Sequence, residues 1–162
     1  MCYNLRMRSV RRKDREIPRD EALAVVDKCA YATMAMVNPD GSPYCVPLSM
    51  AREGEWLYFH SALEGHKTDN LKHQNRVCIC CVGDVKDLPG VFSIGFESAI
   101  INGSAAEITD REEKIRALRL ISMRYTPGNM AAFDEAIQKQ LDFTGVWKIH
   151  IDEISGKENK RK

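Results

Sequence analysis

The feature that most constrains this chain is an apolar strand that passes through a glycine turn into a polar helix. Residues 56–61 alternate with the period of a β-strand, which places Phe59 and His60 on opposite faces. A turn at Gly65 follows, and residues 66–75 are typical of a short polar helix. A strand that feeds such a turn leaves unpaired amide N–H groups at the positive end of a helix dipole. The sequence therefore predicts an anion site at this junction.

Polar side chains around the same junction indicate which anion it binds. Lys67 lies in the first helical turn, where the partial positive charge of the helix end disfavours a cation. A lysine in that position suggests a bound counterion. Ser61, His66, Lys67 and Asn70 fall within ten residues, and this combination of donors favours a phosphate.

Length and charge limit the protein class. A chain of 162 residues is expected to form a single domain, 1–162, with a sizeable core and no need of disulfides. The net charge is +1, and no aromatic stacking face accompanies the basic N-terminal arm, residues 1–16, so we do not expect nucleic acid as a partner. No apolar run is long enough for a membrane span and the first 30 residues lack a signal-peptide core, so a cytoplasmic location is expected.

Alternation and turn signals predict an α+β chain. Six strands are expected, at residues 31–37, 44–50, 56–61, 77–82, 91–107 and 145–151, with a polar loop at 83–90 and a charged tail at 153–162. Helices are expected from Pro18 to Cys29, from 66 to 75, from a Thr109 and Glu112 capping box to Tyr125, and from 130 to 141. Because short turns link most strands and the helices do not alternate with them, the sequence predicts a six-stranded antiparallel β-barrel with flanking helices.

Three strand positions carry finer expectations. Pro47 cannot donate a ladder hydrogen bond, so its strand is expected at a sheet edge or bulged there. Gly95 and Gly103 are expected to be weak points at which the long strand 91–107 bends. The run 77–82 is wholly apolar and is expected to be buried on both faces.

The six cysteines are interpreted as reduced thiols. Cys2 lies in a polar tail, whereas the others lie among apolar neighbours and are expected in the core: Cys29, Cys45, Cys78, Cys80 and Cys81. The group at 78–81 lacks the spacing of a zinc site and has no nearby histidine, so no metal is expected.

The junction also resembles a known family. The string HSALEGHKTDNL, preceded by YF, resembles the flavin-binding segment of the pyridoxamine 5'-phosphate oxidase-like split barrels, in particular the nitroimidazole-resistance (Nim) branch. Three further strings agree in order along the chain: RRKDREI at 11–17, DGSPYCVPLSM at 40–50 and SGKEN at 155–159. The resemblance covers most of the chain.

The resemblance implies a flavin at the predicted phosphate site, FMN or alternatively FAD. Its phosphate would meet Ser61, His66, Lys67 and Asn70, and its ring would lie beside His60, the expected catalytic residue. Residues expected to contact the cofactor also include Pro47, Leu48, Ser49, Phe59 and Ala62, with Ser98 and Trp147 contributed by either subunit of a homodimer.

The implied activity is FMN-dependent reduction of a nitroimidazole or another small oxidant, with His60 donating a proton near neutral pH. A flavin carrier or redox sensor without turnover stays open as an alternative. So does a haem-binding split barrel that uses His60 or His150 as the axial ligand.

Overall fold

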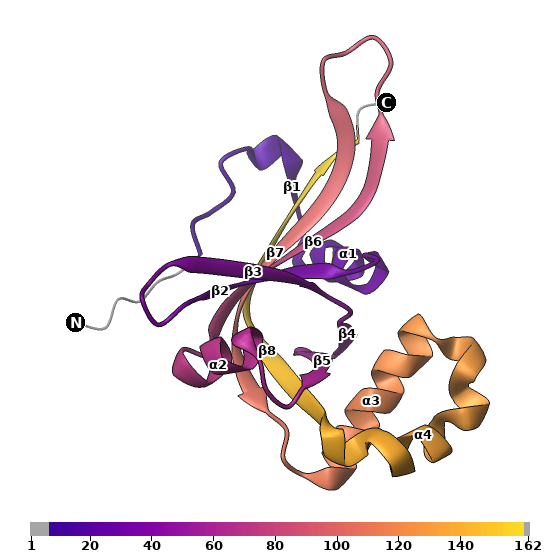
Figure 1. The fold of residues 1–162 in the computed structure, drawn as a ribbon. Helices are drawn as coiled ribbons and strands as arrows, with labels where there is room; N and C mark the ends of the chain where they lie inside the picture. The colour runs from indigo at the N-terminus through magenta and orange to yellow at the C-terminus, as the bar shows by residue number, and fades with distance from the viewer. Residues whose placement is uncertain (1–6, 161–162) are drawn as a thin grey trace.

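Short apolar runs joined by tight turns fold into one antiparallel sheet that curls on itself (Figure 1). The computed structural model describes residues 7–160. The strands are β1 (Glu16–Ile17), β2 (Ala32–Val37), β3 (Pro43–Leu48), β4 (Ala51–Glu53), β5 (Trp56–Ala62), β6 (Arg76–Asp87), β7 (Ile94–Glu107) and β8 (Thr144–Asn159). The helices are α1 (Arg19–Lys28), α2 (His66–His73), α3 (Arg111–Tyr125) and α4 (Phe133–Gln140), with 3₁₀ segments η1 (Lys13–Arg15), η2 (Pro127–Ala132) and η3 (Leu141–Phe143).

The strand order shows that the sheet is a split barrel. Along the sheet the strands follow β3-β2-β6-β7-β8-β5-β4, and β1 pairs with β8. The two edge strands, β3 and β4, are nevertheless consecutive in the chain and are joined only by Ser49 and Met50. Three Cα steps span at most about 11 Å, so the edges must approach each other there. No β3–β4 ladder closes the gap between these described strands, which makes it the split of the barrel.

The main core fills the barrel beneath α1. This helix and the residue that follows it contribute Ala22, Val25, Val26 and Cys29, which share one face because they are spaced at i, i+3, i+4 and i+7. Gly156 of β8 allows the close approach of this layer, since a Cβ there would meet Ile17 Cγ1 at 2.6 Å and Ala22 Cβ at 2.7 Å.

Two strands are longer than predicted, and the sheet has eight strands rather than six. β8 runs to Asn159, so most of the expected tail 153–162 is strand, with Gly156 and Asn159 buried. β6 continues to Asp87 through most of the expected loop 83–90. The added strands, β1 and β4, are two and three residues long.

The expected burial of 77–82 on both faces is wrong. Residues of β6 alternate between buried and exposed, because one face of the sheet is not covered by a helix. Cys29 and Cys81 are buried as predicted, whereas Cys45 and Cys78 are exposed and Cys80 is half-buried. All five are free thiols, and Cys2 lies outside the described residues.

Irregularities occur at some of the predicted positions. The β7–β8 register shifts between Asn102 and Gly103, as expected, but Gly95 pairs regularly with Lys86. Pro47 lies on edge strand β3, which confirms that prediction. The α3 cap is Asp110, whose side chain accepts a hydrogen bond from the amide of Glu113, rather than Thr109.

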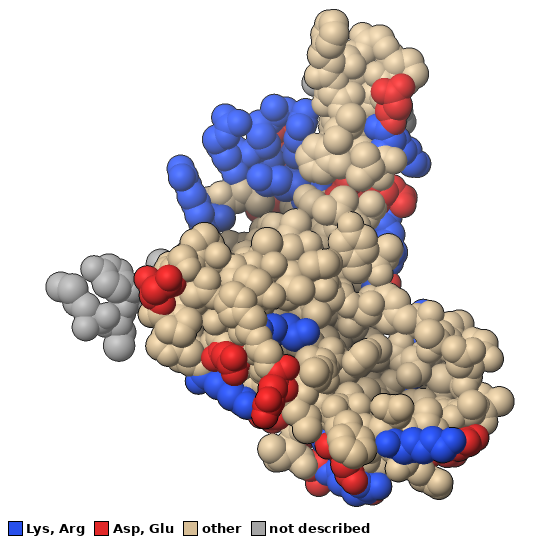
Figure 2. All heavy atoms as spheres, viewed as in Figure 1, with Lys and Arg blue, Asp and Glu red and all other residues tan. Residues whose placement is uncertain are grey.

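Helices α3 and α4 and the N-terminal arm lie outside the main core, whereas α2 contributes Leu71 to it. Helices α3 and α4 form a separate layer against β5, and the β6–β7 hairpin extends away from the barrel (Figure 1). Figure 2 shows basic side chains gathered over the N-terminal arm, where Arg12 pairs with Asp14 at 2.5 Å and Lys13 with Glu16 at 2.6 Å. Among residues 7–160, no helix has the length and apolar character needed to cross a membrane.

Candidate functional site

The predicted strand–turn–helix junction is present between β5 and α2. Gly65 precedes α2 with a φ of 137°, a conformation that side chains rarely adopt. No side chain caps the helix at this residue. The first amide N–H groups of α2 are therefore directed toward a region in which an anion would be stabilised.

Lys67 stands in the first turn of α2 as a cation without a counterion. Its Nζ lies 5.5 Å from the centroid of the Phe59 ring, and it forms no ion pair or hydrogen bond with residues 7–160. Burial lowers the pKa of Lys67, because the charged ammonium loses hydration that no carboxylate replaces. A bound anion would compensate for this loss.

One side of the end of β5 has no strand neighbour. β8 pairs with the whole of β5, but β4 pairs only with residues 56–58. From Phe59 to Ala62, within the described chain, the backbone on the β4 side is consequently an open edge at the split. Such an edge offers N–H and C=O groups to a ligand.

His66 and Asn70 contact the β2–β3 turn. His66 Nε2 lies 2.7 Å from Asn38 Oδ1, and the His66 ring is 4.0 Å from that of Tyr44, measured between centroids. Asn70 is buried, and its Nδ2 donates to the same Asn38 oxygen at 2.7 Å. These contacts give both residues a role in holding α2 against the turn. His66 and Asn70 were predicted to contact the phosphate because of their spacing in the sequence. That spacing gives no indication that both side chains bond to Asn38.

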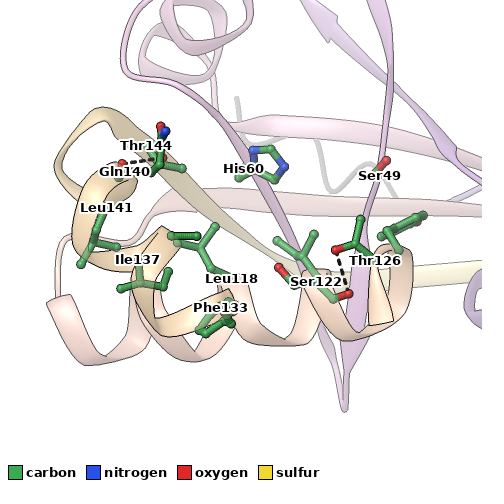
Figure 3. Close-up of a pocket in the computed structure, with 13 residues that line it drawn as sticks. Ser49, His60, Leu118, Ser122, Thr126, Phe133, Ile137, Gln140, Leu141 and Thr144 are labelled. Atoms are coloured by element: carbon green, nitrogen blue, oxygen red, sulfur yellow. Dashed lines mark hydrogen bonds between the residues drawn. The ribbon is translucent and has the colours of Figure 1, made fainter. Parts of the chain in front are cut away.

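His60 projects from the face of β5 opposite Phe59 into a cavity of about 380 Å³ (Figure 3). Ser49, at the crossing between β3 and β4, lies on the wall with it. The opposite wall comes from α3 and α4, including Leu118, Phe133 and Ile137. The cavity therefore opens at the split, beside the two residues that the sequence placed at the cofactor ring.

The pKa of His60 is lowered from its ordinary value. Burial among neighbouring groups is the larger cause, and the positive charge of Lys67 is the second. At neutral pH the imidazole is consequently neutral, with one nitrogen donating and the other accepting. The expectation that His60 titrates near neutrality is corrected to a lower pH.

The other expected cofactor contacts are divided between the core and the split. Phe59 and Trp147 are buried and stacked, with centroids 6.4 Å apart, and Trp147 Nε1 has no partner in the described chain. Leu48 packs against the core, whereas Pro47 is exposed.

Ser61 and Ala62 end β5 at the open edge. Ser61 Oγ donates to the carbonyl of Ala62 at 2.8 Å, so the hydroxyl is already engaged within the chain. The open backbone of these two residues is free of a β4 partner.

Ser98 does not join these residues within one chain. It pairs with Lys157 of β8, whereas His60 pairs with Val146, eleven residues earlier on the same strand. At ~3.3 Å per residue the separation along β8 is roughly 30 Å or more.

Sequence reasoning missed much of the cavity wall. Helix α3, which the sequence predicted, lines the cavity with Leu118, Ser122 and Tyr125. The α4 wall was not assigned a function, although the i, i+3, i+4 spacing of Phe133, Ala136 and Ile137 marks an apolar face. Among the described residues, no group of three or more side chains is arranged to hold a metal.

Comparison with known proteins identifies the family. The family model described as pyridoxamine 5'-phosphate oxidase matches residues 18–158. The chain belongs to the pyridoxamine 5'-phosphate oxidase family. The search of curated proteins found no match.

Solved structures of similar fold agree with this family. A protein from Bacteroides thetaiotaomicron, named for 5-nitroimidazole antibiotic resistance, is 29% identical, with 88% of this chain and 86% of that chain covered and a TM-score of 0.76. A FAD-binding protein from Mesorhizobium loti is 20% identical over 90% and 98% of the chains, with a TM-score of 0.67. A FAD and heme binding protein from Mycobacterium smegmatis is 23% identical over 89% and 72%, with a TM-score of 0.76. The last two likenesses support the fold alone.

Proposed function

We propose that this member of the pyridoxamine 5'-phosphate oxidase family binds FMN and reduces a small oxidant. The observation that carries the proposal is Lys67, a half-buried cation that has no counterion among residues 7–160, beside the uncapped start of α2. The ester phosphate of FMN supplies the negative charge that this position lacks. The family match adds weight, because neighbours of this fold include proteins named as flavin binders.

The residues present fit a flavin phosphate. Lys67 and the first N–H groups of α2 would hold the phosphate, and the open backbone of residues 59–62 would contact the remainder of the cofactor. Pro47, Leu48 and Ser49 border the same split. A bound flavin would supply electron transfer between a reduced donor and the oxidant.

His60 would act on the oxidant rather than on the phosphate. It faces the cavity, while Lys67 lies against the Phe59 face of the strand. A neutral imidazole can donate a hydrogen bond from one ring nitrogen to an oxygen or nitrogen of the molecule being reduced, and its protonated form, which becomes populated as the pH falls, can transfer a proton to it. The similar protein from B. thetaiotaomicron is named for 5-nitroimidazole antibiotic resistance. This name supports a nitro compound as the oxidant.

A homodimer is part of the proposal. Ser98 can join a site at β5 only if a second copy supplies it. Large apolar side chains on β6, on β7 and at their hairpin are exposed in the single chain and would gain cover from a partner: Val82, Val85, Val91, Phe92 and Ile94. We propose a cytoplasmic homodimer that binds neither nucleic acid nor membrane.

Replacing Lys67 tests the phosphate contact. Lys67→Ala removes a charge-assisted contact and should weaken FMN binding by about 1.5–3 kcal/mol, roughly 10- to 150-fold in Kd. Equilibrium dialysis of the full chain against FMN measures this change. Lys72→Ala is the matched control, since Lys72 is exposed on the same helix. Equal Kd values for the two variants would contradict the assignment.

Two simple measurements separate the alternatives. In the absorption spectrum of the purified protein, a Soret band in place of the flavin bands would indicate haem. If the protein retained FAD in preference to FMN, the cofactor would be FAD. Stopped-flow mixing of the reduced protein with a nitroimidazole distinguishes a reductase from a flavin carrier or sensor, because only a reductase is reoxidised rapidly.

A further inference from the structure

The cavity beside His60 is built without charged side chains. Its thirteen lining residues include no Lys, Arg, Asp or Glu, and they come from β5, α3, α4 and their neighbouring segments. Four other surface hollows each include charged residues, such as Lys86 and Glu97 in one and Arg8 and Arg76 in another. The uncharged lining is therefore a property of this cavity rather than of the surface in general.

Three of the seven polar side chains that line the cavity are already used within the chain. Thr126 Oγ1 donates to the carbonyl of Ser122 at 3.2 Å, and Thr144 Oγ1 donates to that of Gln140 at 2.8 Å (Figure 3). Tyr125 Oη is bonded to the backbone of Met50.

The polar side chains that stay available come from both the sheet and the helices that line the cavity. The His60 ring, the hydroxyls of Ser49 and Ser122 and the side-chain amide of Gln140 form no hydrogen bond with the residues that the structure describes. His60 and Ser49 both belong to the sheet side of the cavity, at the split (Figure 3). A ligand would thus find a polar end at His60 and Ser49, facing helix walls that are mainly apolar and carry Ser122 and Gln140 as further polar side chains.

Size and desolvation narrow the ligand class. A volume of about 380 Å³ is near the lower limit of small-molecule sites, which suits one or two rings. An ion transferred into such a cavity loses hydration without gaining a counterion, which costs several kcal/mol. An uncharged molecule avoids this cost.

We propose that this cavity binds a small uncharged molecule whose apolar body packs between α3 and α4 and whose one polar group meets His60 and Ser49. The inference rests on the proposed function in taking this molecule to be the oxidant. It excludes substrates that carry a carboxylate or phosphate at this site. Pyridoxamine 5'-phosphate, for which the family is named, is accordingly disfavoured here.

A matched pair of probes tests the inference. 4-Nitrobenzyl alcohol and 4-nitrobenzoate share a ring and a nitro group and differ in charge. Binding to the full chain, saturated with FMN, is followed by NMR through the methyl signals of Ile121 and Ile137 on the cavity wall. The alcohol should bind at least about tenfold more tightly than the carboxylate, a difference of roughly 1.4 kcal/mol. Pyridoxamine 5'-phosphate should not displace it.

Adding one charge to the wall should remove most of the preference for the alcohol. Gln140 lines the cavity and is exposed at the end of α4, so Gln140→Lys is expected to fold and to strengthen 4-nitrobenzoate binding about tenfold. Gln138→Lys adds the same charge to the same helix outside the cavity and should leave both affinities unchanged.

Three results would overturn the inference: equal binding of the two probes, binding of neither, or equal effects of the Gln140 and Gln138 variants. Its failure is distinguishable from that of the proposed function. A protein that discriminates the probes in FMN-free form but never binds FMN would retain this cavity and lose the reductase. A protein that binds FMN through Lys67 but does not discriminate the probes would retain the proposed flavin site and lose the proposed selectivity of this cavity.

Discussion

At the residue scale, Lys67 and His60 have different proposed roles at the end of β5: Lys67 binds the phosphate and His60 acts on the oxidant. They lie on opposite faces of β5, Lys67 against Phe59 and His60 toward the cavity. They are close enough for the lysine charge to lower the pKa of His60. An anion bound at Lys67 would therefore also affect the proton on His60, which couples cofactor binding to the group proposed to donate a proton.

This coupling predicts how His60 titrates. In the cofactor-free protein its ring should titrate below its ordinary pKa of 6.5, because burial and Lys67 both disfavour the imidazolium. The ring is thus neutral through pH 7 and becomes charged only as the pH falls. Lys67→Met should raise the pKa of His60 by removing one of the two causes.

Two-dimensional NMR of the imidazole carbons measures this titration. Lys72→Met serves as the control and should leave the pKa of His60 unchanged. A wild-type pKa at or above 6.5, or a Lys67→Met variant with the wild-type value, would contradict the electrostatic description.

Residue types at the junction were predictable, but their partners were not. Lys67 and His60 stand out because a cation in a first helical turn and a histidine at a strand end are unusual enough to predict chemistry. His66 and Asn70 were equally well spaced, yet both bond to Asn38, 28 and 32 residues away in sequence. Such a tertiary partner leaves no local signal.

At the element scale, α3 fastens the chain where it crosses the split. Tyr125 Oη donates to the carbonyl of Met50 at 2.9 Å and accepts from the Met50 amide at 3.1 Å. Met50 is 3% exposed, so water cannot easily replace these bonds. The same helix forms a wall of the cavity, which links the position of the β3–β4 crossing to the shape of the site.

Removal of this one hydroxyl should be costly. Tyr125→Phe leaves both Met50 backbone groups without partners and should reduce the free energy of unfolding by about 1–3 kcal/mol. Urea denaturation measures the change. Tyr31→Phe is the control, because Tyr31 is 61% exposed, and it should change stability by less than about 0.5 kcal/mol. A Tyr125 variant as stable as the control would refute the fastening role.

Element type was easier to predict than element length. Helix α1, strands β2 and β3 and the β5–α2 junction were predicted from periodicity and turn signals, and the structure confirms them. β8 was predicted to end at Ile151 because charged residues follow, yet those residues face outward while Gly156 packs beneath α1. The charged residues on the exposed face of a long strand therefore make the strand difficult to recognise in the sequence.

At the scale of the whole molecule, the split organises everything that the chain offers to a ligand. Because β3 and β4 are consecutive but unpaired, the barrel has an opening bordered by Ser49, the open edge of β5 and the start of α2. The number of strands and their order in the sheet determine this opening. The sequence did not predict either correctly, because β1 and β4 were not recognised as strands. The proposed homodimer rests on the exposed face of β6 and on the remote position of Ser98.

The central claim is that a flavin phosphate is held where β5 passes into α2, and the visible absorption spectrum of the purified protein tests it most directly. We predict the spectrum of an oxidised flavin in the wild-type protein, after addition of FMN if necessary, and its loss on gel filtration of Lys67→Ala. A wild-type protein that is colourless and takes up no added FMN would contradict the account.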